Sequence, residues 1–221
     1  MTEEEWDRVF ELTMPIISTG IGVLSVTLAI MALTSSRLGW RVLYEDGQYL
    51  VNVRGHWQNL RDFIQPSNPD VLAVYTQIGP DYWALYDFVC RNVSYRLDFG
   101  EFWQVPSETL GGIWEGGQGY GDCEDTAILL TSLLRNFTQA HVAVGMYQGY
   151  GHAWCQRAGQ ILETTYTSAR VVTDPLDYCP YLYFNDQEVI ELWPGALEEM
   201  FALRRDEVTK LDLMAEASVV K

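Results

Sequence analysis

The chain has 221 residues, of which 48% are hydrophobic and 13% aromatic. This apolar content can form a buried core, which excludes an intrinsically disordered protein. Thirty Asp and Glu against fourteen Lys and Arg give a net charge of -16. That charge repels phosphate backbones and excludes nucleic acid as a partner. The four cysteines lack zinc-type spacing, so we expect no disulfide scaffold, no metal and no cofactor.

An uncharged stretch follows the acidic N-terminal segment 1–11 and covers residues 12–34. A helix of this length measures about 35 Å at about 1.5 Å per residue, which is enough to cross a bilayer core of about 30 Å. A buried core helix is the alternative, although the stretch exceeds the usual length of a globular helix. The sequence therefore predicts a single-pass membrane protein whose main domain covers residues 35–221.

The membrane segment also predicts a partner and an orientation. Small residues recur on one face of the helix and would let a second transmembrane helix approach closely; they are Ser18, Gly22, Ser25, Ala29 and Ala32. A chance distribution of small residues is the alternative. Arg37, Arg41 and Arg54 follow the segment, whereas only Arg8 precedes it. The positive-inside rule then places the main domain on the cytoplasmic side.

The first half of the main domain mixes strand and helix patterns. Residues 41–54 alternate around Asp46-Gly47, which is typical of a β-hairpin with a tight turn. Helical patterns follow at residues 70–77 and 81–92, and an extended segment follows at 94–99. The glycines and proline of residues 106–121 predict a long irregular loop.

The second half places one helix beside several short strands. Residues 122–137 are apolar nearly all round, so we expect a central, buried helix. Strand patterns follow at 142–147, 153–157 and 161–166, and Ala158-Gly159-Gln160 predicts a hairpin loop between the last two. The predicted fold class is α+β. Beyond residue 166 we recognise no motif.

Cys123 lies where a glycine-rich loop meets the first turn of the central helix, in the sequence Gly-Tyr-Gly-Asp-Cys-Glu-Asp. Asp122 is a candidate N-cap, and Asp125 completes an arrangement like a capping box. N–H groups at a helix N-terminus stabilise a thiolate and can bind an oxyanion. Cys123 is therefore a candidate nucleophile, and an inert buried cysteine is the alternative.

His152 and Glu163 are the candidate partners of this thiol. His152 begins a strand 29 residues after Cys123, an order that brings helix and sheet together. Glu163 lies on the next strand of the same hairpin, where a carboxylate could orient the imidazole. A structural histidine and an outward-facing strand glutamate are the alternatives.

Four segments in this order resemble the transglutaminase-like superfamily, in particular its microbial cysteine peptidases. They are YGDCEDTAILLTSLLR, AHVAVG, GHAW and ILETT, with PSETL before them, and the resemblance covers about residues 82–166. It implies a papain-like fold with the cysteine helix packed on an antiparallel sheet. It also implies that Cys123 is the nucleophile, His152 the base and Glu163 the orienting acid.

Two positions depart from the family pattern. The third member of the family's triad is more often Asp, and Glu163 is one methylene longer. Animal transglutaminases carry Gln before the cysteine, where this chain has Asp122, so hydrolysis is expected rather than crosslinking. We expect a membrane-anchored cysteine peptidase or amidase acting on a protein or peptide substrate. The alternative is a structural or accessory subunit of a membrane or virion assembly that retains the fold.

Two further features remain open. An oxyanion donor could come from the side chain of Trp103, Gln104 or Gln118. Aromatic residues near the predicted site could line a groove or could belong to the core; they are Trp103, Trp114, Tyr120 and Trp154.

Overall fold

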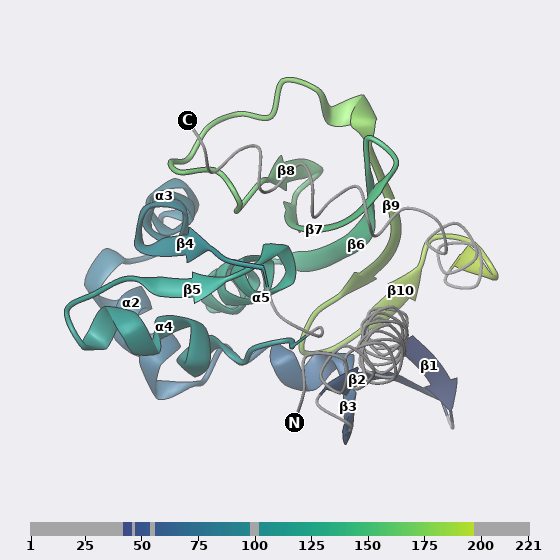
Figure 1. The fold of residues 1–221 in the computed structure, drawn as a ribbon, viewed down its shortest axis with the longest axis horizontal. Helices are drawn as coiled ribbons and strands as arrows, with labels where there is room; N and C mark the ends of the chain where they lie inside the picture. The colour runs from purple at the N-terminus through teal and green to yellow at the C-terminus, as the bar shows by residue number, and fades with distance from the viewer. Residues whose placement is uncertain (1–41, 46, 54–55, 98–101, 197–221) are drawn as a thin grey trace, which may run out of the picture. The chain divides into compact units, whose positions relative to one another are not determined.

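The computed structural model describes residues 42–45, 47–53, 56–97 and 102–196 (Figure 1). The predicted transmembrane helix at 12–34, its small-residue face and the C-terminal residues 197–221 lie outside these ranges. Within the described part of the chain, no helix has the length and apolar character needed to cross a membrane. The membrane segment therefore stays a prediction.

The predicted hairpin is confirmed. Strand β1 (Val42–Glu45) pairs antiparallel with β2 (Gln48–Val53), and Gly47 in the turn has φ +77°, a conformation that glycine adopts without strain. A third strand, β3 (His56–Asn59), pairs with β2 and completes a small sheet. The 3-10 helix η1 (Leu60–Phe63) follows it.

The next two helices also agree with their predicted ranges. Helix α2 (Pro69–Ile78) begins after Asn68, whose side chain accepts a hydrogen bond from a backbone N–H of the first turn. Helix α3 (Tyr82–Asn92) begins in the same way after Asp81. Such N-caps satisfy backbone donors that have no partner inside the helix. The predicted extended segment is strand β4 (Val93–Tyr95).

The prediction of a long irregular loop at 106–121 is wrong. Residues Pro106–Trp114 form helix α4, and Gly119–Gly121 form strand β5, which pairs in parallel with β4. Pro106 suits the first turn of a helix, and the Glu108 carboxylate accepts the Val105 N–H at 2.9 Å. A Cβ on Gly112 would clash with the backbone oxygen of Gln118. This glycine therefore permits a close backbone approach rather than an irregular loop.

The main sheet has the strand order β10-β9-β6-β7-β8, with every neighbouring pair antiparallel. Strands β6 (His141–Tyr147) and β7 (Tyr150–Arg157) match predicted strands, whereas β8 (Gln160–Leu162) covers only the start of the strand predicted at 161–166. Glu163 therefore lies directly after β8 and not on a strand. Strands β9 (Tyr178–Phe184) and β10 (Val189–Glu191) lie in the region where no motif was recognised. The short 3-10 helix η2 (Pro175–Asp177) precedes β9.

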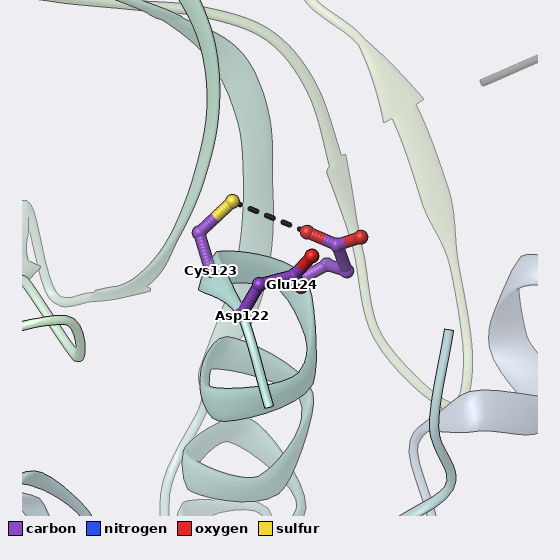
Figure 2. A group of neighbouring side chains, drawn as sticks. All are labelled: Asp122, Cys123 and Glu124. Carbon is purple, nitrogen blue, oxygen red and sulfur yellow. Dashed lines mark hydrogen bonds between the residues drawn. The ribbon is translucent and has the colours of Figure 1, made fainter. Parts of the chain in front are cut away.

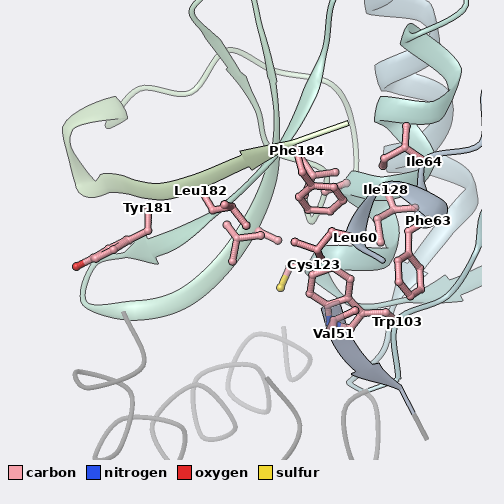
Figure 3. Packing of buried hydrophobic residues seen from close by; sticks show 14 of the residues in the cluster. Val51, Leu60, Phe63, Ile64, Trp103, Cys123, Ile128, Tyr181, Leu182 and Phe184 are labelled. Carbon is pink, nitrogen blue, oxygen red and sulfur yellow. The ribbon is translucent and has the colours of Figure 1, made fainter. Parts of the chain in front are cut away.

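Helix α5 (Cys123–Leu134) is central, as predicted, and every one of its residues is buried. It contacts β6 and β7 on one side and α2, α3 and α4 on the other, an arrangement visible in Figure 1. Its apolar residues join two clusters: Ala127 and Ile128 pack with residues of β2, β6 and β9, whereas Leu129, Leu130 and Leu133 pack with α2 and α3. Figure 3 shows the first cluster, which includes the Cys123 sulfur.

Candidate active site

The N-terminus of α5 is fixed by the carboxylate of Asp125, which is completely buried. It accepts the N–H of Asp122 at 3.2 Å and the N–H of Gln104, in the segment before α4, at 2.7 Å. A Cβ on Gly121 would lie 2.8 Å from one of these carboxylate oxygens. A glycine at this position therefore leaves room for the carboxylate that holds the first turn of the helix.

Cys123 is buried at the start of α5, between a carboxylate and the sheet. Its thiol donates a hydrogen bond to Oε2 of the neighbouring Glu124 at 3.1 Å, as Figure 2 shows. The backbone N–H of Ala153 in β7 acts on the same thiol and lowers its pKa. Since Ala153 directly follows His152, the sulfur lies against the part of β7 that carries the predicted base.

The surroundings of Cys123 favour the protonated thiol. Burial raises its pKa well above the ordinary value, and the negative charges of Glu124 and Asp122 raise it further, whereas the Ala153 N–H lowers it. A helix N-terminus alone would lower a thiol pKa. The pKa therefore moves in the direction opposite to that expected, because the sulfur is buried and carboxylates lie beside it.

His152 and Glu163 form a close pair. Nε2 of His152 lies 2.7 Å from Oε2 of Glu163, and both side chains are largely buried. An ionised carboxylate accepts only, so Nε2 carries the proton that it donates to Glu163. In the neutral imidazole Nδ1 is then the basic nitrogen. The structure thus brings together the predicted base and acid, while their catalytic roles stay a prediction.

Four hydrogen bonds hold the Glu163 carboxylate. His152 and the Tyr178 hydroxyl donate to Oε2, and the Thr165 N–H and hydroxyl donate to Oε1 at 2.9 and 2.7 Å. Burial opposes ionisation of this group. The positive charge and hydrogen bond of His152, with the Thr165 donors, outweigh burial and lower the pKa of Glu163 to about 2.

Three aromatic side chains surround the imidazole, and sequence reasoning missed two of them. Tyr147, Trp154 and Tyr178 have ring centroids 5.8, 6.1 and 6.2 Å from that of His152. Trp154 had been left open as a groove residue, and its side chain is buried in the core instead. Tyr178 lies on β9, beyond the last recognised motif, so the sequence offered no signal for it.

The other open candidates are now placed. Trp103 is buried and packs against Phe63 and Phe184. The Gln104 side chain accepts a hydrogen bond from Thr109, and the Gln118 side chain accepts one from Ser94. Among the aromatic groove candidates, exposed side chains are found on Trp114 and Tyr120.

Cys123 and its two neighbours in the chain bring three groups of metal-ligand type together, although we expected no metal. One ligand atom each from Asp122, Cys123 and Glu124 lies within 4.8 Å of the others. These residues combine two carboxylates with one thiol, and hard cations prefer oxygen ligands alone. Among the described residues the cysteines Cys90, Cys123, Cys155 and Cys179 are all free.

Comparisons with known proteins give a few structural similarities. No protein-family model matches the chain, and no curated protein matches it in sequence. LapG of Legionella pneumophila is 18% identical with a TM-score of 0.40, over 64% of this chain and 83% of that chain. Its calcium-bound form is 19% identical with a TM-score of 0.40, over 64% and 85%. A candidate cysteine protease from Cytophaga hutchinsonii is 22% identical with a TM-score of 0.35, over 53% and 42%.

Proposed function

We propose that this protein is a thiol acyl-transfer enzyme, a cysteine peptidase or amidase, with Cys123 as nucleophile, His152 as base and Glu163 as orienting acid. One observation carries the proposal. Nε2 of His152, on strand β7, lies 2.7 Å from the buried Glu163 carboxylate, and β7 packs against helix α5, which begins at Cys123. Neither packing nor helix capping requires a His–carboxylate pair on the strand that contacts this helix.

The proposed reaction begins with transfer of the thiol proton. Nδ1 of His152 takes the proton of Cys123, and the sulfur attacks the carbonyl carbon of an amide. The negative charge that develops on the carbonyl oxygen is stabilised by N–H groups at the start of α5. The Glu163 carboxylate stabilises the imidazolium and keeps its proton on Nε2.

The second half returns the proton and releases the products. His152 gives the proton to the leaving amine as the carbon–nitrogen bond breaks, which leaves a thioester on Cys123. Water, activated by the neutral imidazole, attacks the thioester and releases a carboxylic acid. The Cys123 thiol reforms as His152 returns the proton of the water.

Cleavage of a peptide library tests the proposal. The full chain is incubated with a proteome-derived peptide library, and new termini are identified by mass spectrometry. We expect cleavage by the wild type and none by Cys123→Ala or His152→Gln. Cys155→Ala is the matched control, because Cys155 is a buried thiol in the core, and it should cleave as the wild type does. Cleavage that survives Cys123→Ala would refute the assignment.

Membrane anchoring is the second part of the proposal and rests on the uncharged segment 12–34. A helix of this hydrophobic length resists extraction by alkaline carbonate, whereas a peripheral protein is released. We expect the full chain to stay in the membrane fraction and a chain lacking residues 1–34 to be released. Release of the full chain by carbonate would refute the anchor.

The small-residue face of the segment would bind a second transmembrane helix. Gly22→Leu with Ala29→Leu should weaken that association.

The scaffold alternative has one observation in its favour. The Cys123 pKa is raised rather than lowered, as expected of a thiol that is not a nucleophile. Iodoacetamide separates the two functions. Because the resting thiol is protonated, Nδ1 of His152 has to take its proton, so alkylation of Cys123 in an enzyme should slow in His152→Gln, whereas alkylation of a scaffold should be unchanged by that substitution.

A further inference from the structure

We infer that Tyr178 is a positioning residue of the proposed catalytic group, and that its hydroxyl fixes the carboxylate that orients His152. This inference rests on the proposed function. Tyr178 is buried, and its hydroxyl donates to Oε2 of Glu163 at 2.9 Å. The same oxygen accepts the Nε2 proton of His152 at 2.7 Å. One carboxylate oxygen is therefore shared by the imidazole and the phenol.

The carboxylate is held on both of its oxygens. Thr165 donates twice to Oε1, and Tyr178 donates to Oε2. A carboxylate held only at Oε1 can still pivot about that oxygen, which would carry Oε2 away from the imidazole. The Tyr178 hydroxyl prevents this rotation and leaves His152 one direction in which to donate.

The Tyr178 ring also has a fixed place beside the imidazole. Its centroid lies 4.4 Å from Tyr147, 5.1 Å from Trp154 and 6.2 Å from His152. These contacts already restrict the rings of Tyr178 and His152. The hydrogen bond from the Tyr178 hydroxyl to the carboxylate therefore costs little further side-chain entropy. Replacing Tyr178 by Phe would keep the packing and remove only the hydrogen bond.

A β-bulge aligns Tyr178 with the site. Between β6 and β9 the register shifts at Val144/Gly145, so that Val144 pairs with Leu182 but Gly145 pairs with Pro180. Such a one-residue shift puts the side chains of residues 178–180 on the opposite face from the one they would take in an unbroken register with residues 182–184. Tyr178 consequently lies in the cluster of Trp154, and the next residue, Cys179, is exposed.

The bulge itself depends on a close approach at Gly145, which pairs with His152 across β6 and β7. A Cβ on Gly145 would clash with the backbone oxygen of Cys179 and lie 2.7 Å from the Cα of Pro180. The residue opposite the base is therefore also the residue that lets β9 come close enough for Tyr178 to reach Glu163.

Tyr178→Phe tests the inference, with Tyr183→Phe as the matched control. Tyr183 lies on the same strand and packs on the same aromatic cluster. The first readout is the low-field proton NMR signal of the His152 Nε2–H, identified by its loss in His152→Gln. We expect its exchange with water to become about tenfold faster in Tyr178→Phe and to stay unchanged in Tyr183→Phe. This readout needs no substrate.

The second readout is kinetic, on a peptide taken from the library cleavage. We expect kcat of Tyr178→Phe to fall about tenfold while KM stays within about twofold, because the hydroxyl acts on the imidazole and touches no substrate. Circular dichroism confirms that each variant is folded. An unchanged signal and an unchanged kcat would overturn the inference. If the wild type cleaves nothing, the proposed function fails, while the NMR signal still decides whether Tyr178 fixes the His152–Glu163 pair.

Discussion

The candidate site has an acid end at Glu163 and a thiol end at Cys123, and their surroundings shift the pKa in opposite directions. Around Glu163, four donors converge on one carboxylate and lower its pKa to about 2. Around Cys123, burial and two neighbouring carboxylates raise the pKa of the thiol, and the Glu124 carboxylate accepts its hydrogen bond. The structure thus holds His152 and Glu163 as a close pair, while the Cys123 thiol is kept protonated.

A pair of threonines joins the two ends. The Thr126 hydroxyl, in the first turn of α5, lies 2.8 Å from the Thr164 hydroxyl, next to Glu163 in the chain. Thr126 also lies within hydrogen-bond distance of the backbone oxygens of Asp122 and Cys123. The distance between nucleophile and acid is therefore set by contacts inside the core. The electrostatics of the two ends can differ while their spacing stays fixed.

The largest expected effect on kcat comes from Glu163→Gln, which removes the carboxylate charge at the acid end. The two Thr165 donors require an acceptor, so the amide oxygen faces Thr165 and the amide NH₂ faces His152. Nε2 must then accept, which puts the imidazole proton on Nδ1, where it cannot take the proton of Cys123. We expect kcat to fall about a thousandfold.

A second His–carboxylate pair provides the control for that variant. His141 and Glu188 lie 3.0 Å apart, away from Cys123 and with Glu188 half exposed. Glu188→Gln should leave kcat unchanged. A fall of less than about tenfold in Glu163→Gln would mean that the acid does not orient the base.

The lowered pKa of Glu163 should make the stability of the fold depend on pH. The pKa of Glu163 is lowered from 4.5 to about 2 on folding. Its stabilisation is therefore complete above pH 4.5 and is lost as pH falls toward 2. A difference of this size corresponds to about 3 kcal/mol. In urea unfolding at pH 5 and pH 2.5, the wild type should lose more unfolding free energy than Glu163→Gln. An equal loss in both proteins would contradict the lowered pKa.

The sequence could predict the features that depend on local patterns, and it missed those that depend on contacts between distant segments. Cys123 and His152 belong to local patterns, a helix start and a hairpin strand, and Glu163 directly follows the second strand of that hairpin. Local patterns of this kind are visible in one sequence. Helix α4 was missed because its glycines look like loop residues, while the reason for Gly112 is a neighbouring backbone oxygen. Tyr178 was missed because only a bulge between β6 and β9 brings it to the site.

The raised pKa of Cys123 was missed for a related reason. The position at a helix N-terminus is readable from the sequence and lowers a thiol pKa. Whether Asp122 and Glu124 face solvent or the sulfur is decided by the packing of α5 against the sheet. Both are buried. A local motif thus predicted that Cys123 lies at the start of a buried helix but not the sign of its electrostatic environment.

Glu124→Gln should lower the raised pKa of Cys123, so that its surroundings favour the charged form as those of Glu163 do. Removing the charge of the carboxylate that accepts the thiol proton lowers the pKa of Cys123. We expect alkylation of Cys123 by iodoacetamide at pH 7 to become about tenfold faster, which corresponds to one pKa unit. Glu115→Gln, at an exposed position after α4, should not change the rate. A slower reaction in Glu124→Gln would mean that Glu124 assists the thiolate.

The smallest effect is expected from Tyr86→Phe, which tests how the main chain supports the acid. The buried Tyr86 hydroxyl donates to the backbone oxygen of Glu163 at 2.9 Å and lies 3.3 Å from that of Arg170. Losing one such hydrogen bond should lower the unfolding free energy by about 1 kcal/mol. Tyr75→Phe is the control, because Tyr75 stacks on Phe137 and has no hydroxyl hydrogen bond among the described residues.

The two tyrosines near Glu163 should then separate by readout. Tyr86 holds the backbone and Tyr178 holds the carboxylate, so Tyr86→Phe should change urea stability while leaving the exchange of the His152 Nε2–H unchanged. If Tyr86→Phe changed that exchange as much as Tyr178→Phe does, the backbone of Glu163 would control the imidazole. Tyr86 and Tyr178 would then not have separate roles, because both hydroxyls would act on His152 through the same movement of Glu163.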